Sequence, residues 1–444
     1  MFKYIIFGLC FLLSFSLQAQ PEKGSLLIKN GTILTITNGV LENTDVYIRE
    51  GKIFRIGKNI KGPKEVRIID ATGMFVMPGI IDAHSHAGLS AINEGTNPIT
   101  PEVAVGDAVE PTDITLYRAL AGGVTASHAM HGSANAIGGQ CITLKHRWGE
   151  TDPENFIMEG APRTIKFALG ENPMRVHGER SGVNPSSRMG VEQVIRKAFA
   201  DAQDYQAAWK KHEANPETDA PAYSLRLQTM VDIMEGKILI HCHSYRADEI
   251  LMLLEVLADY GVKDITFQHT NEGFKVAPEL AAFGAHASVF SDWWAYKFEV
   301  YYSTAYNAAI LTKNGVITSI NSDSGELIRH LYHEAAKTQR YGSMTDNQAL
   351  RMITLNPAIQ LGIDDRVGSI EKGKDGDIAI FKNHPLSIYA VPQQTIIDGV
   401  VRFDINQDAD DMRLSVNPEE KVMPILYYSR DLESCLEGTT MENK

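Results

Sequence analysis

Short apolar runs alternate with amphipathic helical patterns through the middle of the chain, from about residue 75 to residue 372. The apolar runs include GVTASHAM, TIKFALG, KILIHCHS and DITFQHT, and ADEILMLLEVLADYG is one of the helical segments between them. Strand–helix alternation over about 300 residues favours a parallel α/β fold. Roughly eight repeats predict a closed (β/α)8 barrel of the TIM type.

Two β-rich flanks enclose this region. Residues 20–74 contain short strand patterns separated by Asn-Gly, Glu-Gly and Lys-Gly turn signals, and residues 373–405 show the same pattern. We therefore expect an α/β fold in which the barrel, residues 75–372, is inserted in a small discontinuous β-sandwich domain. Residues 406–444 form an acidic C-terminal tail.

The N-terminus has the pattern of a secretory signal peptide. Lys3 precedes an apolar run from Tyr4 to Phe15, and small or polar residues lead to Ala19. The run is shorter than the ~20 apolar residues of a membrane-spanning helix. We expect residues 1–19 to be cleaved and the mature chain to be periplasmic or secreted, without a membrane attachment. An uncleaved membrane anchor is the alternative.

Charge and cysteine content exclude two classes of protein. The formal net charge is −13 and the sequence pI about 5.6, which gives no electrostatic footprint for a nucleic-acid partner. Three scattered cysteines remain after the leader, Cys141, Cys242 and Cys435. They form no CxxC pattern, so neither a disulfide framework nor a cysteine zinc site is expected.

Potential metal ligands follow several predicted strands. His84 and His86, two apart at a strand end, point to the same side, which at a barrel mouth faces the active centre. Each ligand candidate also has a purely structural explanation, such as a buried core histidine or a helix cap. Histidine and carboxylate groups without a cysteine cluster suit zinc or another divalent transition ion. The remaining strand-end candidates are Lys166, His241, His243, His269 and Asp323.

These motifs resemble those of the amidohydrolase superfamily, metal-dependent hydrolases that combine a (β/α)8 barrel with a small β-sandwich. The matching segments are MFVMPGIIDAHSH, IKFALGEN, LIHCHS, TFQHT, SINSDS and LNPAIQLGIDDRVGSIEKGKDGDIAIF. The resemblance extends to about Asp404 and is greatest to imidazolonepropionase-like and Xaa-Pro dipeptidase-like members.

The resemblance implies two divalent metal ions, and Zn²⁺ is the expected metal. His84 and His86 would hold the more buried ion, and His241 and His269 the more exposed one. Asp323 would ligate the first ion beside a bridging water, and would act as the catalytic proton carrier.

Lys166 is unusual because it lies within an apolar strand pattern, where an unpaired ammonium is costly. It matches the fourth-strand lysine of binuclear members, which reacts with CO₂ to form a metal-bridging carbamate. A salt-bridged or snorkelling lysine is the alternative, and Glu171 is the rival bridging carboxylate.

Ser244 stands where deaminases and imidazolonepropionases carry Glu or Gln, three residues after the fifth-strand histidine. This favours hydrolysis of a C–N bond, amide or peptide-like, in a small-molecule or dipeptide-like substrate by a metal-bridging hydroxide. An ester, lactone or phosphotriester hydrolase with the same metal site is one alternative. A catalytically silent metal-binding module is another.

Three residues are candidates for substrate binding. Arg175 could hold a substrate carboxylate bidentately, or pair with Glu171. His243 could bond the carbonyl oxygen or the leaving group, and His131 lies in a loop expected at the barrel mouth. The substrate, the physiological metal and the oligomeric state, a homo-oligomer included, stay open.

Overall fold

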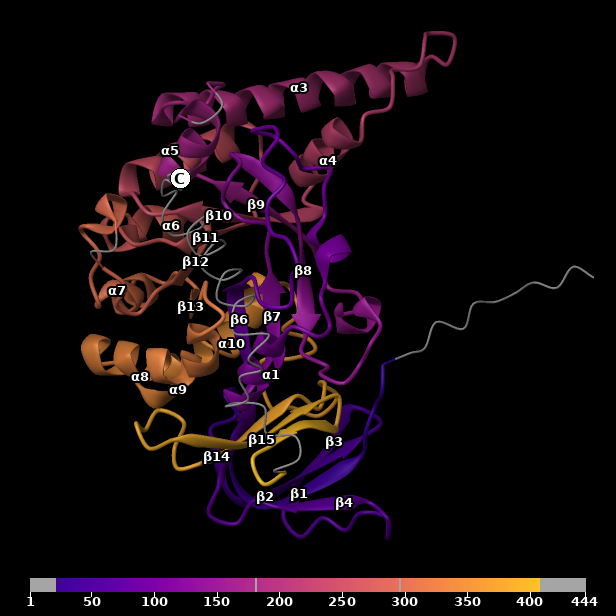
Figure 1. Cartoon of the computed structure of the whole chain (residues 1–444), viewed down its shortest axis with the longest axis vertical. Coiled ribbons are helices and arrows are strands. Elements are labelled where there is room, and N and C mark those ends of the chain that lie inside the picture. The colour runs from indigo at the N-terminus through magenta and orange to yellow at the C-terminus, as the bar shows by residue number, and fades with distance from the viewer. Residues whose placement is uncertain (1–20, 180–181, 295–296, 408–444) are drawn as a thin grey trace, which may run out of the picture.

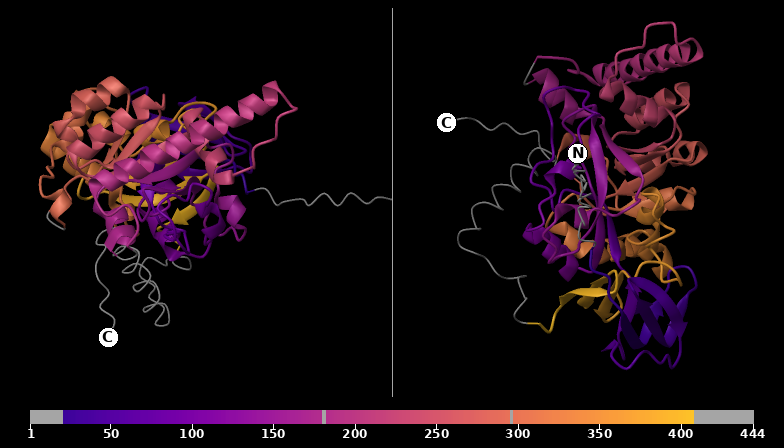
Figure 2. Two further views of the ribbon diagram at one scale, coloured as in Figure 1. Left: turned by 90° about the horizontal axis from the view of Figure 1, so that it is seen from above. Right: turned by 90° about the vertical axis from the view of Figure 1, so that its right-hand side faces the viewer.

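The computed structural model describes residues 21–179, 182–294 and 297–407. It has a mixed α/β architecture, with a barrel-like sheet surrounded by helices and a second sheet at one end (Figure 1; Figure 2). The expected signal peptide and nearly all of the acidic tail lie outside these ranges. Within them, no helix combines the length and apolar character needed to cross a membrane.

Eight strands form the barrel sheet, in the order β13-β12-β11-β10-β9-β8-β7-β6. They are β6 (Ile80–Ser85), β7 (Val124–Ala129), β8 (Ile137–Lys145), β9 (Arg163–Ala168), β10 (Ile238–Ser244), β11 (Ile265–His269), β12 (His286–Val289) and β13 (Thr318–Ile320).

One barrel strand runs against the others. β8 pairs antiparallel with both β7 and β9, whereas the other neighbouring pairs are parallel. Residues 130–136, which join β7 to β8, are too few for the crossover of a dozen or more residues that a parallel pair requires. The prediction of an all-parallel barrel built from eight strand–helix repeats is therefore wrong at this strand.

The two outer strands of the barrel sheet, β6 and β13, approach each other and nearly close it. Ile81 N donates to Ile353 O at 2.9 Å, so the chain after β13 returns against β6. Beyond the end of β13, Asp323 N donates to His84 O at 3.0 Å. This second bond joins two strand ends that carry predicted metal ligands.

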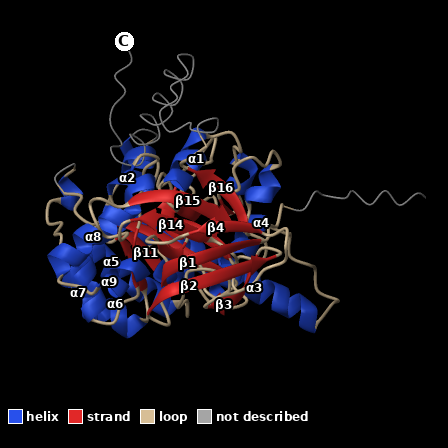
Figure 3. Ribbon diagram, turned by 90° about the horizontal axis from the view of Figure 1, so that it is seen from below, coloured by secondary structure: helices blue, strands red, loops and turns tan. Residues whose placement is uncertain are grey.

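The second sheet combines both β-rich flanks of the sequence, with β14 and β15 beside β1 and β2 (Figure 3). In the strand order, β5 lies between β14 and β1. Phe75–Pro78 thus belongs to this sheet, although the sequence placed the start of the barrel at residue 75. At Gly79 a Cβ would lie 2.0 Å from Thr125 Oγ1, so only glycine fits where the chain enters the barrel. The strands are β1 (Leu26–Leu34), β2 (Val40–Arg49), β3 (Lys52–Gly57), β4 (Arg67–Asp70), β5 (Phe75–Pro78), β14 (Ile378–Lys382), β15 (Val391–Ile397) and β16 (Val400–Asp404).

Helices cover the barrel, and the longest, α3, lies across the top of Figure 1. The α-helices are α1 (Ile114–Ala121), α2 (Glu171–Met174), α3 (Arg188–Ala214), α4 (Leu225–Met234), α5 (Ala247–Asp259), α6 (Ala277–Phe283), α7 (Asn307–Lys313), α8 (Leu331–Gly342), α9 (Asp346–Arg351) and α10 (Leu355–Gln360). Short helical turns occupy Val105–Ala108, Pro153–Phe156, Arg175–Glu179, Gly273–Lys275, Phe298–Val300 and Leu327–His330.

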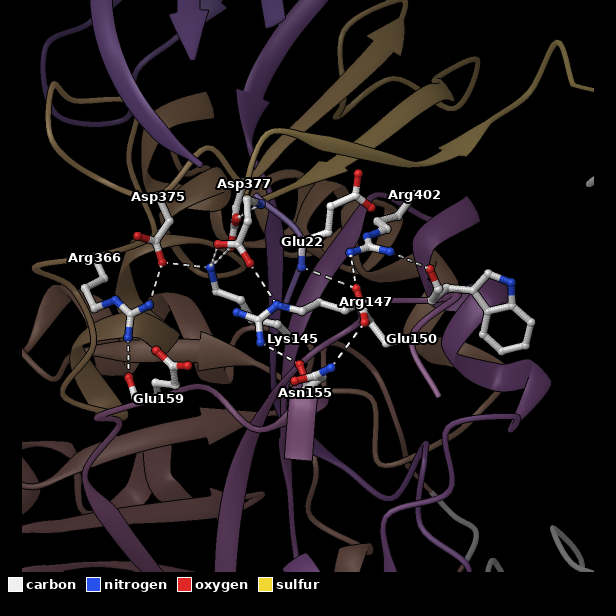
Figure 4. A network of polar contacts seen from close by, with 12 residues as sticks. Glu22, Lys145, Arg147, Glu150, Asn155, Glu159, Arg366, Asp375, Asp377 and Arg402 are labelled. Carbon is white, nitrogen blue, oxygen red and sulfur yellow. Dashed lines mark hydrogen bonds and ion pairs between the residues drawn. The ribbon is translucent and has the colours of Figure 1, made fainter. Parts of the chain in front are cut away.

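An ionic cluster joins the barrel to the second sheet (Figure 4). Lys145, the last residue of β8, is fully buried, and its Nζ lies 2.7 Å from Asp375, 3.0 Å from Asp377 and 2.6 Å from Asp398. Arg147 also contacts Asp398, at 2.8 Å. The three carboxylates come from the segment before β14 and the turn between β15 and β16, so the cluster fixes how the two sheets meet.

Candidate metal centre

Two predicted ligands leave the end of β6 beside Asp323. Nε2 of His86 lies 3.2 Å from Asp323 Oδ1, and Nε2 of His84 lies 3.5 Å from the same oxygen. Nδ1 of His86 is 2.9 Å from Met130 O, which fixes the orientation of the ring. The strand ends of β6 and β13 therefore bring three of the predicted residues together.

His269, at the end of β11, joins the same group. Its Nε2 lies 3.6 Å from Asp323 Oδ2, and its ring stacks on that of His84 with centroids 4.7 Å apart. His269 has φ 66°, Thr270 has φ 43° and Asp323 has φ 45°. Positive φ is uncommon for residues other than glycine, and such strain persists where the surrounding structure holds it, often at functional sites. The positive φ angles of His269 and Asp323 accompany the contact between their side chains.

Lys166 reaches this group from the neighbouring strand β9. Its side chain is almost fully buried, and Nζ lies 3.0 Å from His84 Nε2. In the register of β9 and β10, Lys166 pairs with His241, so both side chains point into the barrel. The fourth-strand lysine thus lies among the predicted metal ligands.

Burial sets the protonation states of the centre. It is the main cause that lowers the pKa of His84 well below its usual value and the pKa of His269 to about 3. For Asp323, burial alone would raise the pKa, but a hydrogen bond from His86 and nearby positive charge outweigh it and lower the pKa. Neutral imidazoles and an ionised carboxylate are the forms that bind a cation.

His241 lies deeper, against His128, with ring centroids 4.2 Å apart. Its Nδ1 is 3.0 Å from Gln268 Nε2, and within the described ranges its buried Nε2 has no hydrogen-bond partner. Among the described residues, His84, His86 and His269 contact Asp323, whereas His241 does not.

His243 lies closer to the mouth than His241. Its ring packs edge-on against His269 and Tyr245, with centroids 4.8 Å and 4.6 Å apart, and its Nε2 is 3.5 Å from Asn172 Nδ2. The structure therefore places this predicted substrate-binding residue directly beside one predicted metal ligand.

The other two predicted substrate-binding residues are engaged elsewhere. Arg175 Nη2 lies 3.3 Å from Glu171 Oε2, so the sequence's alternative of an internal pair describes this arginine. His131 accepts a hydrogen bond from Glu94 N at Nε2, 2.9 Å away, and its Nδ1 is 2.9 Å from Gly132 O. A substrate could bind either His131 nitrogen only by displacing a backbone contact.

Sequence reasoning missed three residues at the centre. Asp82 accepts hydrogen bonds from the backbone of His84 and Ser322, and so ties the ends of β6 and β13 together. Gln268 orients His241, and Lys297 lies over the ring of Tyr245. Asp82 and Gln268 stand within two residues of predicted ligands, a signal that could have found them, whereas Lys297 has no such neighbour.

The residues present fit a divalent cation. Ligand atoms of His84, His269 and Asp323 all lie within 4.8 Å of one another. Among the described residues, neither ring nitrogen of His269 has a hydrogen-bond partner, and neither does Nδ1 of His84. Buried nitrogens without a partner are costly, and a cation would satisfy one nitrogen of the His269 ring. Nitrogen and carboxylate donors are those of zinc and similar ions.

The barrel sheet carries candidate metal ligands at its strand ends, and comparison with known proteins specifies the class of protein. Residues 75–402 match the Amidohydrolase family. "Amidohydrolase tasK" of Hapsidospora irregularis is 31% identical over 399 residues, which is 81% of this chain. The chain spans 40% of the length of that relative.

Solved structures agree on the fold. A crystal structure of an amidohydrolase from Thermotoga maritima MSB8 is 34% identical and has a TM-score of 0.79, covering 85% of this chain and 100% of that one. A prolidase complexed with N-methylphosphonate-L-proline has a TM-score of 0.53 at 17% identity, covering 86% of this chain and 100% of that one. The chain belongs to the Amidohydrolase family, and it is a hydrolase with candidate metal-binding residues.

Proposed function

We propose that this hydrolase uses divalent metal ions, most plausibly zinc, to cleave a C–N bond of a small amide or peptide-like substrate. The observation that carries the proposal is the cluster of His84, His86, His269 and Asp323 around the buried end of Lys166. Export is part of the proposal and rests on the sequence of residues 1–19.

When bound, the metal ions would lower the pKa of a water molecule and polarise the substrate carbonyl. Asp323 is suited to move the proton. Its backbone N is bonded to His84 O and its carboxylate contacts three imidazoles, so its position is fixed. Because its pKa is lowered, the carboxylate starts ionised, accepts the proton of the water and delivers it to the leaving nitrogen.

Lys166 would complete the ligand set as a carbamate. The ammonium first loses one proton, and the neutral amine then forms the N–C bond to carbon dioxide and releases a second proton. A buried cation is thereby replaced by an anion. The rival bridge, Glu171, contacts Arg175 at 3.3 Å and Lys297 at 3.5 Å, which supports Lys166. His241, with Nδ1 held by Gln268, would offer Nε2 as a further ligand.

A metal titration combined with a substrate panel tests the function. The protein is stripped of metal, reloaded with zinc in steps, and assayed with dipeptides, esters and phosphotriesters. We expect hydrolysis of an amide that rises with bound metal. Hydrolysis of esters or phosphotriesters without hydrolysis of amides would favour the alternative ester, lactone or phosphotriester hydrolase. Metal binding without turnover of any substrate would favour a catalytically silent module.

Chemical rescue tests the bridge. We expect Lys166→Ala to lose activity and to regain part of it when short carboxylic acids such as acetate are added, because their oxygens can replace those of a carbamate. A Lys166→Ala protein that binds two metal ions and turns over normally would refute the carbamate. Glu171→Ala is the matched variant and should show no such rescue.

A further inference from the structure

A third buried lysine, Lys297, lies next to the candidate metal centre. It follows β12, and its side chain is 7% exposed. Its Nζ lies 4.2 Å from the centroid of the Tyr245 ring, which stacks on His269 at 5.5 Å and packs edge-on against His243 at 4.6 Å. The Tyr245 ring therefore lies between Lys297 and the rings of His269 and His243.

The polar contacts of Lys297 are all long. Its Nζ is 3.4 Å from Asn172 Oδ1, 3.5 Å from Glu171 Oε1 and 3.7 Å from Glu299 Oε2. An ammonium offers three donors and normally makes shorter bonds to ionised acceptors. Lys297 is thus held by two long ion pairs and one long hydrogen bond.

The two neighbouring carboxylates already have arginine partners. Glu299 Oε1 lies 2.7 Å from Arg188, and Glu171 Oε2 lies 3.3 Å from Arg175. Arg188 also lies 2.6 Å from Glu249, so the arginines neutralise these acids only in part, and Lys297 supplies the third positive charge of the group.

The backbone holds the acidic residues where they are. Gly170, which precedes Glu171, has φ 79°, and a Cβ there would lie 2.7 Å from Glu299 Oε1. Gly170 N donates to Glu249 at 3.0 Å, and Glu171 N donates to Glu299 at 3.0 Å. These bonds fix the backbone of Gly170 and Glu171, from which the Glu171 carboxylate lies 3.5 Å from Lys297 Nζ.

We propose that Lys297 binds a carboxylate of the substrate, so that the enzyme prefers amides that carry an anionic group close to the scissile bond. This inference rests on the proposed function for its choice of substrate. Arg175, suggested for the role by the sequence, is held by Glu171 and is more exposed, at 33%, which weakens its ionic contacts. A substrate carboxylate could approach the Lys297 ammonium more closely than Glu171 and Glu299 do.

Binding without turnover gives the first test. Calorimetry measures the affinity of the zinc-loaded protein for N-acetylglycine and for its uncharged analogue N-acetylglycinamide. We expect Lys297→Met to weaken binding of N-acetylglycine by about 10–100-fold and to leave N-acetylglycinamide within about twofold. Lys297→Arg, which keeps the charge, should retain most of the affinity, and Arg175→Met is the matched loss of a neighbouring cation. Metal content and the thermal midpoint verify that each variant is folded.

The inference is overturned if Lys297→Met binds N-acetylglycine like the wild type, or if Arg175→Met causes the larger loss. A second assay separates it from the proposed function by comparing a dipeptide with its C-terminal carboxamide. Equal hydrolysis of both by the wild type refutes the role of Lys297 and leaves the amide hydrolase standing. If no amide is hydrolysed but N-acetylglycine still needs Lys297, the role of Lys297 stands and the proposed function fails.

Discussion

Lys145 and Lys166 are both buried lysines at barrel strands, and they differ in what surrounds the ammonium. Lys145 Nζ contacts three carboxylates, those of Asp375, Asp377 and Asp398, at 2.6–3.0 Å. Lys166 Nζ lies 3.0 Å from a ring nitrogen of His84. Burial alone would lower the pKa of Lys145, but the three carboxylates outweigh it and raise the pKa. The first lysine is compensated by the protein itself.

Two clusters of this protein consist of metal-binding residue types, and they differ in whether a cation of the protein already compensates them. The ligand atoms of Asp375, Asp377 and Asp398 lie within 4.8 Å of one another, as do those of His84, His269 and Asp323. In the acidic cluster an ammonium already occupies the position of a cation. In the histidine cluster, buried ring nitrogens have no hydrogen-bond partner among the described residues. Residue type alone does not identify a metal site; the compensation of charge does.

The largest effect is expected at the histidine cluster. Asp323→Asn should lower kcat by about 10²–10⁴-fold, because the amide cannot accept the proton of the attacking water. The histidines keep their positions, so the variant should still bind metal. Steady-state kinetics together with metal analysis measure both effects. An unchanged rate would remove the proton-carrying role from Asp323.

At the acidic cluster the cost should appear in stability instead. Lys145→Met leaves three buried carboxylates without their central cation and should reduce the free energy of unfolding by about 3–5 kcal/mol. Denaturant unfolding of the metal-free protein measures the change. Retention of full stability would mean that Arg147 and the other cations around the cluster compensate the three carboxylates without Lys145.

Most of the candidate centre could be predicted from the sequence because its residues stand at strand ends. His84, His86, His269 and Asp323 each follow a short apolar run, and parallel strands bring such positions to one mouth. The same reasoning placed Lys166 inside the barrel. These predictions need only the local pattern and the order of strands.

Features that depend on contacts distant in sequence could not be predicted in this way. Lys297 meets Glu171 across 126 positions, and nothing in its own segment marks it as buried. The antiparallel course of β8 is different, because the short connection of residues 130–136 is a local signal that already excludes a parallel crossover. The ionic cluster of Lys145 joins β8 to residues more than 200 positions away, so local sequence patterns could not predict these ion pairs.

The acidic cluster should also respond to pH. Burial raises the pKa of Asp377 from 3.8 to about 6, so between these values the folded state holds a proton that the unfolded state has released. This group therefore favours folding as the pH falls from about 6 to about 4 and loses that contribution as the pH rises through 6. Asp377→Asn should remove this slope, a change of about 1–3 kcal/mol in the pH dependence of unfolding. An unchanged slope between pH 4 and 6 would show that another group titrates there.

The smallest change in the free energy of unfolding is expected at Lys166. Lys166→Met is the same substitution as Lys145→Met at an equally buried position, but in metal-free protein it should change the free energy of unfolding by less than about 1 kcal/mol. The methionine removes an ammonium from a site dominated by neutral imidazoles, and the attraction lost to Asp323 is offset by the desolvation cost that also disappears. Denaturant unfolding of both variants in the presence of a chelator measures the difference. A loss at Lys166 as large as that at Lys145 would make it a compensated structural lysine, and would leave no energetic reason for it to become a metal ligand.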